Sequence, residues 1–435
     1  MNDTESSRSA ATTRSTATTA GRLDEIWFLT SELEGERASS FRQERWCRIF
    51  LDAGARIVIF NVQGAFGLTE TRCANEREFS AFRRERLAKT RPTSSVREGM
   101  AVRLARRIKH LFLVDLYLPN VVKLVWRCHR LLKARFGPVA VMASSPPFSV
   151  AIAGAILKHL HGDKVVLSVD MRDAWALHSA LGGIRPVKRG IERRVLRRAD
   201  HVTTVSYGLA EEFDRMYGVR VGVMYNVATH YLDAAPAVSI ELTSVSPDID
   251  GGRVQWVYTG STPEGHYDLI SIVGAVALLR QKHPTLADRV QLVFVGACDE
   301  VRREAERQRI ARRDIVFVPH VPHAVARSIQ ASAQALLFLA HHGEGNRGVV
   351  STKLFEYLCL GRPVLPVSLY RSSDVDRLLQ RYCGTSVNVH TAEEIMQIFA
   401  QVASDGPNTL PVLLDAARVR ELVDDYRTQA HIILR

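Results

Sequence analysis

The chain has 435 residues, which is enough for two or three domains. Its 46% hydrophobic and 24% charged residues describe an ordinary soluble globular protein. The six cysteines form no C-x-x-C pair and show no zinc spacing, so we expect reduced thiols in a cytoplasmic protein. The net charge of +12 favours anionic partners such as phospholipid surfaces, nucleotide phosphates or nucleic acid.

The first half of the chain is predicted to begin with a disordered tail and to continue as alternating strands and helices. Residues 1–21 are rich in Ser, Thr and Ala and have almost nothing to bury. Short aliphatic runs bounded by turn signals suit strands buried on both faces, and their alternation with helical patterns implies parallel sheets. The strands predicted here are Glu25–Thr30, Arg56–Val62, Val139–Ala143, Lys164–Asp170, His201–Ser206 and Arg220–Tyr225.

A break is predicted at residues 234–252, where two prolines, several serines and a D-I-D-G-G run indicate a linker. Alternating strands and helices resume beyond it, and a last helix with an apolar stripe is predicted at about 415–434. The later predicted strands are Val254–Gly260, Val290–Val295, Asp314–Pro319, Ala335–Ala340 and Pro363–Val367. The predicted units are a tail (1–21), a first domain (22–233), a linker (234–252), a second domain (253–415) and a C-terminal helix (416–435).

Two polar segments follow predicted strands of the first domain: S-S-P-P at 144–147 and D-M-R-D-A-W at 170–175. Charges at the carboxyl end of a strand are expensive to bury, so they are paired, exposed or functional. Because ligands of α/β sheets bind outside the carboxyl ends of the strands, Asp170, Arg172 and Asp173 are candidate site residues. The alternative is a structural ion-pair network between Arg172 and Asp173.

Two segments are strongly basic, Arg83–Lys109 and a predicted helix at Ile184–Ala199. Basic amphipathic segments are typical of membrane-surface contacts, and a solvated helix face is the alternative. The most apolar stretch, Leu111–Trp126, is too short and too polar to span a bilayer. No nucleic-acid reader motif is present, so nucleic acid is not an expected partner.

The segment G-N-R-G-V-V-S-T-K-L-F-E-Y-L-C-L-G-R-P-V-L at 345–365 predicts a loop, a short helix, a glycine stop and a buried strand. Lys353 and Glu356 are three residues apart and so share one helix face. The N–H groups of the first turn, together with Lys353, attract phosphate, and Glu356 could accept hydrogen bonds from sugar hydroxyls. The segment suits a nucleoside diphosphate; a buried amphipathic helix with one Lys–Glu pair is the alternative.

This segment resembles the donor-site helix of GT-B glycosyltransferases, in particular glycosyltransferase family 4, the group 1 transferases. Members carry a K-L-F-E-Y-L-type helix followed by G-x-P-V. The S-S-P-P turn, the R-D-x-W segment and the A-D-H-V-T-T-V-S run at 199–206 are similar to further motifs of that family, in the same order. The resemblance implies an α/β protein with two Rossmann-like domains whose parallel sheets face an interdomain cleft. The last helix of this family commonly crosses back onto the first domain.

The resemblance also implies an enzyme that transfers a sugar from a nucleoside diphosphate sugar, its co-substrate, to an acceptor alcohol on a glycan or lipid-linked intermediate. Such enzymes retain anomeric configuration and usually need no metal or other cofactor. Asp170, Arg172 and Asp173 would line the acceptor side. The implied donor-binding residues are Gly260, Ser261, His266, Arg347, Gly348, Ser351, Thr352, Lys353 and Glu356. The implied location is the cytoplasm, with the basic helices available for the inner face of the membrane.

Two places depart from the family pattern. Many members have an Arg followed by a Lys where this chain has Ser261 and, downstream, Gly265 and His266. The first of two paired glutamates would fall on Gly348. Two alternatives therefore stay open: a non-catalytic GT-B partner that binds nucleotide sugar or another glycosyltransferase, and a GT-B nucleotide-sugar epimerase.

Overall fold

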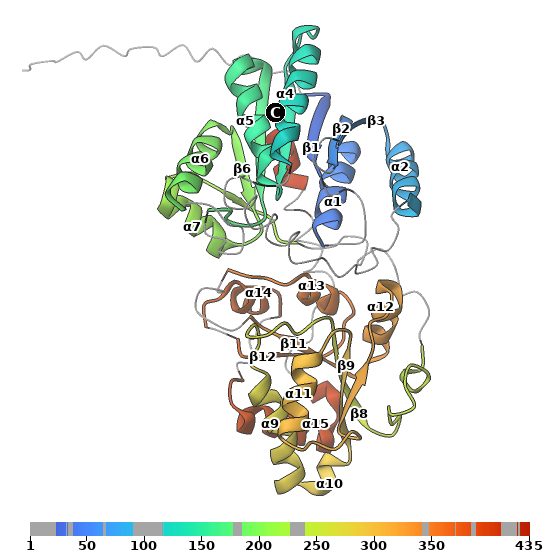
Figure 1. The fold of residues 1–435 in the computed structure, drawn as a ribbon. Helices are drawn as coiled ribbons and strands as arrows, with labels where there is room; N and C mark the ends of the chain where they lie inside the picture. Colours follow the sequence, from blue (N-terminus) through green and yellow to red (C-terminus); the bar gives the residue numbers. More distant parts are fainter. Residues whose placement is uncertain are drawn as a thin grey trace, which may run out of the picture.

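The protein folds into two α/β domains, each built on its own sheet, with one above the other in Figure 1. The structure, a computed structural model, describes residues 23–31, 33, 38–63, 67–89, 115, 117–176, 185–226, 240–341, 348–369, 371–383, 389–409, 424 and 427–435. The predicted tail at 1–21, Arg347 and residues 90–109 of the basic stretch lie outside these ranges. So do residues 234–239 of the predicted linker and residues 416–423, 425 and 426 of the predicted C-terminal helix.

The first sheet has seven strands in the order β3-β2-β1-β4-β5-β6-β7. Six of the strands run parallel, and β3 pairs antiparallel with β2 at one edge. The strands are β1 (Glu25–Thr30), β2 (Arg56–Gln63), β3 (Gly67–Cys73), β4 (Val139–Ser145), β5 (Val165–Met171), β6 (His201–Thr204) and β7 (Gly222–Val223).

The second sheet has five parallel strands in the order β10-β9-β8-β11-β12. The strands are β8 (Val254–Thr259), β9 (Val290–Val295), β10 (Ile315–Val318), β11 (Ala335–Leu339) and β12 (Val364–Val367). In both sheets the central strands are buried along their whole length because helices cover both faces.

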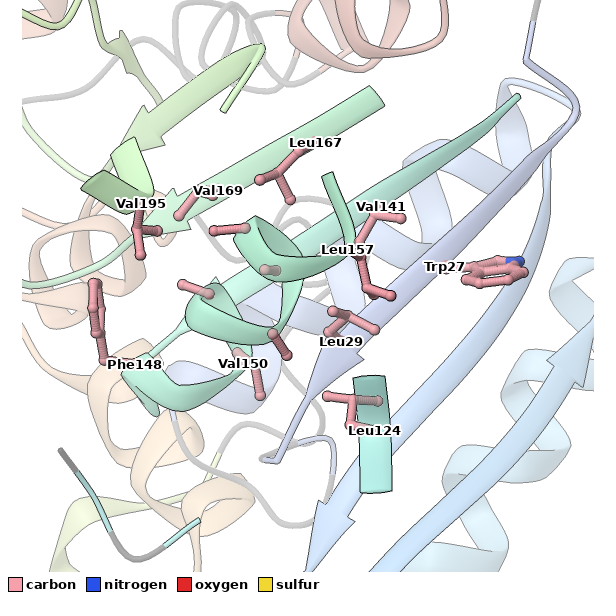
Figure 2. Packing of buried hydrophobic residues seen from close by; sticks show 14 of the residues in the cluster. Trp27, Leu29, Leu124, Val141, Phe148, Val150, Leu157, Leu167, Val169 and Val195 are labelled. Atoms are coloured by element: carbon pink, nitrogen blue, oxygen red, sulfur yellow. The ribbon is translucent and has the colours of Figure 1, made fainter. Parts of the chain in front are cut away.

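Helices of the first domain cover its sheet on two sides. The helices are α1 (Ala38–Asp52), α2 (Glu76–Lys89), α4 (Leu118–Lys133), α5 (Phe148–His161), α6 (Arg185–Arg198) and α7 (Tyr207–Tyr217). Figure 2 shows Leu124 of α4, Leu157 of α5 and Val195 of α6 packed towards the strands β1, β4 and β5. The opposite face packs against α1 and α2, whose Trp46 and Phe79 join a second core.

Helices of the second domain enclose its sheet in the same way. They are α9 (Leu269–Lys282), α10 (Pro284–Ala287), α11 (Asp299–Arg307), α12 (His323–Ser332), α13 (Thr352–Leu358), α14 (Asp374–Cys383) and α15 (Ala392–Asp405). One core lies under α9, α11 and α15, and the other lies under α12, α13 and α14. Short 3-10 turns occur at Gly162–Lys164, Leu242–Ser244 and Pro407–Thr409.

The chain ends in the first domain, on the face covered by α1 (Figure 1). Ala430, Ile433 and Leu434 are buried in that core, and the N–H of Leu23 donates to the carbonyl of Leu434 at 3.0 Å. Among the described residues no helix combines the length and the apolar character that crossing a membrane requires.

The predicted α/β fold with two parallel-dominated sheets is confirmed, and each predicted strand has a counterpart. The prediction missed β3, whose sequence G-L-T-E-T-R-C has no apolar alternation. It is an edge strand with partly exposed side chains, so its backbone pairing with β2 and not burial defines it.

Candidate functional site

A cleft of about 400 Å³ lies between the two domains, a size typical of small-molecule sites. Its second-domain wall comes from the carboxyl ends of β8, β9 and β10 and from α12 and α13, as expected for a ligand site of a parallel sheet. Its first-domain wall comes from α1 and the segment after β7. The lining residues are Phe41, Arg42, Arg45, Asn226, Thr259, Gly260, Ser261, Val295, Gly296, Ala297, His320, Val321, His323, Ala326, Gln330, Thr352, Lys353 and Glu356.

Helix α13 presents two charged residues to this cleft. Ser351 is its N-cap, and its Oγ accepts a hydrogen bond from the N–H of Lys353 at 3.4 Å. Leu354, Phe355, Tyr357 and Leu358 are buried in the domain core, which turns the other face of the helix outward. Thr352, Lys353 and Glu356 line the cleft on that other face.

The Lys353 side chain crosses the end of β8. Its ammonium lies 3.4 Å from the hydroxyl of Tyr258 and 5.3 Å from the centre of the Tyr258 ring. Burial lowers the pKa of Lys353, and the neighbouring Glu356 acts in the opposite direction. A cation in such a partly desolvated place interacts more strongly with an anionic ligand than an exposed lysine does.

Two glycines make room for this lysine. Gly260 has φ +138°, and a Cβ there would overlap the Cε and Nζ atoms of Lys353. Gly296, with φ +119°, lies so close to Gly260 that a Cβ would collide with the Gly260 carbonyl oxygen. The floor of the cleft at the ends of β8 and β9 is therefore bare backbone, which lets a ligand approach it closely.

Glu356 belongs to a buried polar network. Nε2 of Gln330 donates to Oγ1 of Thr259 at 2.7 Å and to Oε2 of Glu356 at 3.3 Å. Nε2 of His323 lies 3.5 Å from the other carboxylate oxygen, Oε1. Oε1 of Gln330 is buried without a hydrogen-bond partner, so the exposed acceptor of this network is the carboxylate of Glu356.

Comparisons with known proteins agree with this architecture. Residues 44–226 match the family model of the glycosyl transferase 4-like domain. By sequence, no curated protein matches the chain. Among solved structures, a trehalose-6-phosphate synthase (OtsA) is 10% identical and has a TM-score of 0.54, over 94% of this chain and 96% of that one.

A second similar structure is an α,α-trehalose-phosphate synthase (UDP-forming) from Burkholderia vietnamiensis. It is 12% identical with a TM-score of 0.53, over 95% of this chain and 96% of that one. These structures are GT-B glycosyltransferases with two Rossmann-like domains. The chain has the GT-B fold, and residues 44–226 are similar to the glycosyl transferase 4-like domain.

The first-domain wall of the GT-B cleft contains an ion pair that the sequence analysis missed. Arg42 on α1 donates from Nε and Nη2 to the two carboxylate oxygens of Asp170, at 2.9 and 2.6 Å, and both side chains are fully buried. Burial would raise the pKa of Asp170, but the charge and hydrogen bonds of Arg42 and a hydrogen bond from Thr203 hold it below its usual value. Asp170 does not line the cleft itself; Arg42 does.

The R-D-x-W segment at 172–175 packs on the S-S-P-P turn at 144–147. Arg172 donates to the backbone carbonyls of Ser145 and Pro146. The Trp175 ring stacks on Phe148 with centroids 4.3 Å apart. Neither Arg172 nor the exposed Asp173 lines the cleft.

Three of the expected donor residues lie outside the cleft lining. His266 is exposed, and its Nδ1 lies 2.9 Å from the carbonyl of Glu264. Ser351 acts as the cap of α13. Gly348 packs against the first turn of α7, where a Cβ would lie 3.3 Å from the Leu209 nitrogen.

The same contact joins the two domains. The N–H groups of Tyr207 and Gly208 at the start of α7 donate to the carboxylate of Asp374 on α14, at 2.9 and 2.7 Å. Arg377 and Glu211 form an ion pair beside it at 3.0 Å. At Gly348, where many family members have a glutamate, the backbones of the two domains therefore lie in close contact.

Several lining residues were not among the sequence candidates: Phe41, Arg42, Arg45, Asn226, Thr259, His320, His323 and Gln330. The arginines of α1 occur at helical spacing, 42, 45 and 48, which by itself indicates a solvated face. The location of Thr259 at the end of β8 and of His320 after β10 is the one signal in the sequence that could have found them.

Proposed function

We propose that the protein is a glycosyltransferase that binds a nucleoside diphosphate sugar in the interdomain cleft and transfers its sugar to an acceptor alcohol. The observation that carries the proposal is the pair Lys353 and Glu356 on α13, which faces Arg42 and Arg45 of α1 across a GT-B cleft. Residues 22–233 would be the acceptor domain and residues 253–415 the donor domain.

The main chemical problem of this reaction is the negative charge of the departing diphosphate. The bond between the anomeric carbon and the phosphate oxygen breaks, and its electron pair leaves with the diphosphate. A new bond forms to the acceptor oxygen, whose proton passes to the released diphosphate. Lys353, held in place by Gly260 and Tyr258, would stabilise the developing charge, so no metal ion is required.

Glu356 would bind the nucleoside. Its carboxylate lines the cleft and accepts a hydrogen bond from Gln330, and hydroxyl groups of a ribose are suitable further donors. The acceptor would approach from the first-domain side. There Asp170 would hold the Arg42 side chain in place, and Arg172 would hold the turn at Ser145 behind the cleft wall. We propose that the configuration of the anomeric carbon is retained, as the family resemblance implies.

The acceptor is proposed to be a glycan or a lipid-linked intermediate at the cytoplasmic face of a membrane. Helix α6 supports this location, because its exposed residues include six arginines and its single acidic residue, Glu192, is buried. Arginines at a surface of this kind attract anionic headgroups.

The test is a titration of UDP, GDP, dTDP and ADP, followed by thermal unfolding. A ligand at 100 times its Kd adds about 2.7 kcal/mol of stability to the protein that binds it. We expect one nucleotide to stabilise the wild type and to have a weaker effect on Glu356→Ala and Lys353→Met. The control is Glu393→Ala, which removes an exposed carboxylate on α15. The absence of a shift with every nucleotide would contradict a donor site here.

A second candidate is a GT-B protein that binds nucleotide without transferring sugar. Ser261 and Gly348 support it, because they replace an arginine and a glutamate of the family pattern. Stabilisation by a nucleotide, with neither donor hydrolysis nor transfer to any acceptor, would favour this candidate over the enzyme.

A further inference from the structure

Gln330 on α12 is a buried amide behind the wall of the cleft. Helices α12 and α13 lie at the edge of the second domain that faces the first domain (Figure 1). Gln330 borders the cleft but is 1% exposed, whereas the side chain of Glu356 keeps 12% of its surface exposed. A ligand in the cleft therefore reaches the carboxylate of Glu356 and not the amide of Gln330. Because burying an amide costs free energy unless its groups are hydrogen-bonded, the bonds of this amide indicate what it does.

The amide bridges groups from two other elements of the domain. Nε2 of Gln330 donates to Oγ1 of Thr259 at 2.7 Å and to Oε2 of Glu356 at 3.3 Å. Thr259, the last residue of β8, is held in turn: its N–H donates to the hydroxyl of Tyr357 at 3.0 Å, and its Oγ1 lies 3.3 Å from the same hydroxyl. Tyr357 is fully buried in the domain core. The amide is thus anchored on the sheet and directs an N–H at the carboxylate.

The hydrogen bonds also determine which end of the amide faces Glu356. Turning the amide by 180° would place Oε1 of Gln330 against the carboxylate, acceptor against acceptor, and would take this donor away from Oε2 of Glu356. With the N–H towards Glu356, the contact favours the ionised carboxylate, because a charged acceptor forms the stronger hydrogen bond. The other carboxylate oxygen, Oε1, lies 3.5 Å from Nε2 of His323. Groups on both sides therefore hold the carboxylate in one orientation.

We propose that Gln330 is a positioning residue for the donor nucleotide: its N–H holds the Glu356 carboxylate in the orientation that accepts hydrogen bonds from the ribose hydroxyls. The inference rests on the proposed function, since it needs a nucleotide in the cleft, and it adds a residue that acts on that ligand through Glu356. A glutamine that only tied α12 to β8 would influence folding and would leave the affinity of the folded protein for nucleotide unchanged.

A double-mutant cycle distinguishes these two roles. Gln330→Met keeps the length of the side chain and removes its donors, and Gln330→Glu keeps the shape and replaces the N–H group by an oxygen that repels Glu356. Isothermal titration with UDP, GDP, dTDP and ADP first identifies the nucleotide that the wild type binds best. We expect both variants to bind it about 10-fold more weakly, the low end for a hydrogen bond to a charged group. In the Glu356→Ala background, Gln330→Met should change the affinity by less than about 2-fold.

A modified ligand and a matched variant serve as controls. The 2′,3′-dideoxy form of the same nucleotide should bind equally to the wild type and to Gln330→Met, because it offers no ribose hydroxyl to Glu356. Ser328→Ala should bind nucleotide like the wild type, since Ser328 is buried on the same helix, bonds the carbonyl of Ala324 and does not line the cleft. Thermal unfolding without nucleotide shows which variants are folded, and Gln330→Glu takes the place of Gln330→Met in the cycle if the latter does not fold.

The outcomes separate this inference from the proposed function. An equal loss of affinity with and without Glu356, or equal affinity of the wild type and both Gln330 variants, would overturn the inference and leave the donor site intact. A wild type that binds none of the four nucleotides would contradict the proposed function, and this inference with it.

Discussion

Replacing Asp170 by asparagine should destabilise the first domain, because it leaves a buried arginine without its counter-charge. Arg42 and Asp170 are both fully buried and share two hydrogen bonds. Breaking a buried pair on one side typically costs about 3–5 kcal/mol. Arg42 keeps an acceptor in the carbonyl of Met224, 2.6 Å away, so we expect about 3 kcal/mol, the low end of that range. For a domain of this size the melting temperature should fall by roughly 6–12 °C.

The pH dependence of unfolding gives the same reasoning a second readout. Arg42 lowers the pKa of Asp170 in the folded protein, against the effect of burial, while the unfolded chain has an ordinary value of about 3.9. The stability from this pair is therefore fully present above about pH 4 and is lost as the pH falls through the lower folded value. The asparagine variant should lack this part of the acid destabilisation.

The assay is thermal unfolding followed by circular dichroism between pH 3 and pH 7. Asp173→Asn, next to it but exposed, is the control and should change the stability by less than about 0.5 kcal/mol. The double variant Arg42→Met/Asp170→Leu should recover part of the loss, since no unpaired charge remains. A stable Asp170→Asn protein that has lost sugar transfer would refute the structural account and make Asp170 an acceptor-binding residue.

Two further predictions concern glycines. Gly260→Ala should weaken nucleotide binding by about 10- to 100-fold, the value of one hydrogen bond to a charged group, because the new Cβ displaces Lys353. The control is Gly265→Ala, since Gly265 also has a positive φ but open space around it, and this variant should bind nucleotide like the wild type. Isothermal titration of nucleotide into each variant measures the difference. Gly208→Ala should separate the domains, because its Cβ would lie 2.8 Å from the Cα of Gly348 and from Oδ2 of Asp374. Small-angle scattering of Gly208→Ala should then show a larger radius of gyration than the wild type. The control Gly190→Ala adds a Cβ in open space on α6 and should leave the radius of gyration unchanged. An unchanged radius for Gly208→Ala would contradict a tight contact between the domains.

Burial explains which parts of the fold could be predicted from the sequence. The strand Val290–Val295 is apolar at every position except Gln291, so pattern alone located it with the right ends. The edge strand β3 was missed because backbone pairing, which leaves no mark on side-chain type, defines it.

The site residues also divide into those that sequence pattern can locate and those that only the folded structure brings together. The spacing of Lys353 and Glu356 indicated one helix face, and both line the cleft. Arg42 could not be found in this way, because its partner Asp170 lies 128 residues away and only the folded sheet brings the two together. Ala430 and Ile433 were predicted as part of an apolar stripe, but the surface that receives them belongs to another domain.

The return of the C-terminal segment has a mechanical consequence. The chain leaves the first sheet after β7, builds the second domain, and comes back to pack Ile433 and Leu434 beside β1. The domains are thus joined by two covalent crossings instead of one. A single tether permits rotation in any direction, whereas two separate tethers restrict the relative motion to bending about the line that connects them. Two crossings would therefore bring Arg42 of one domain and Lys353 of the other back to the same register after any such bending.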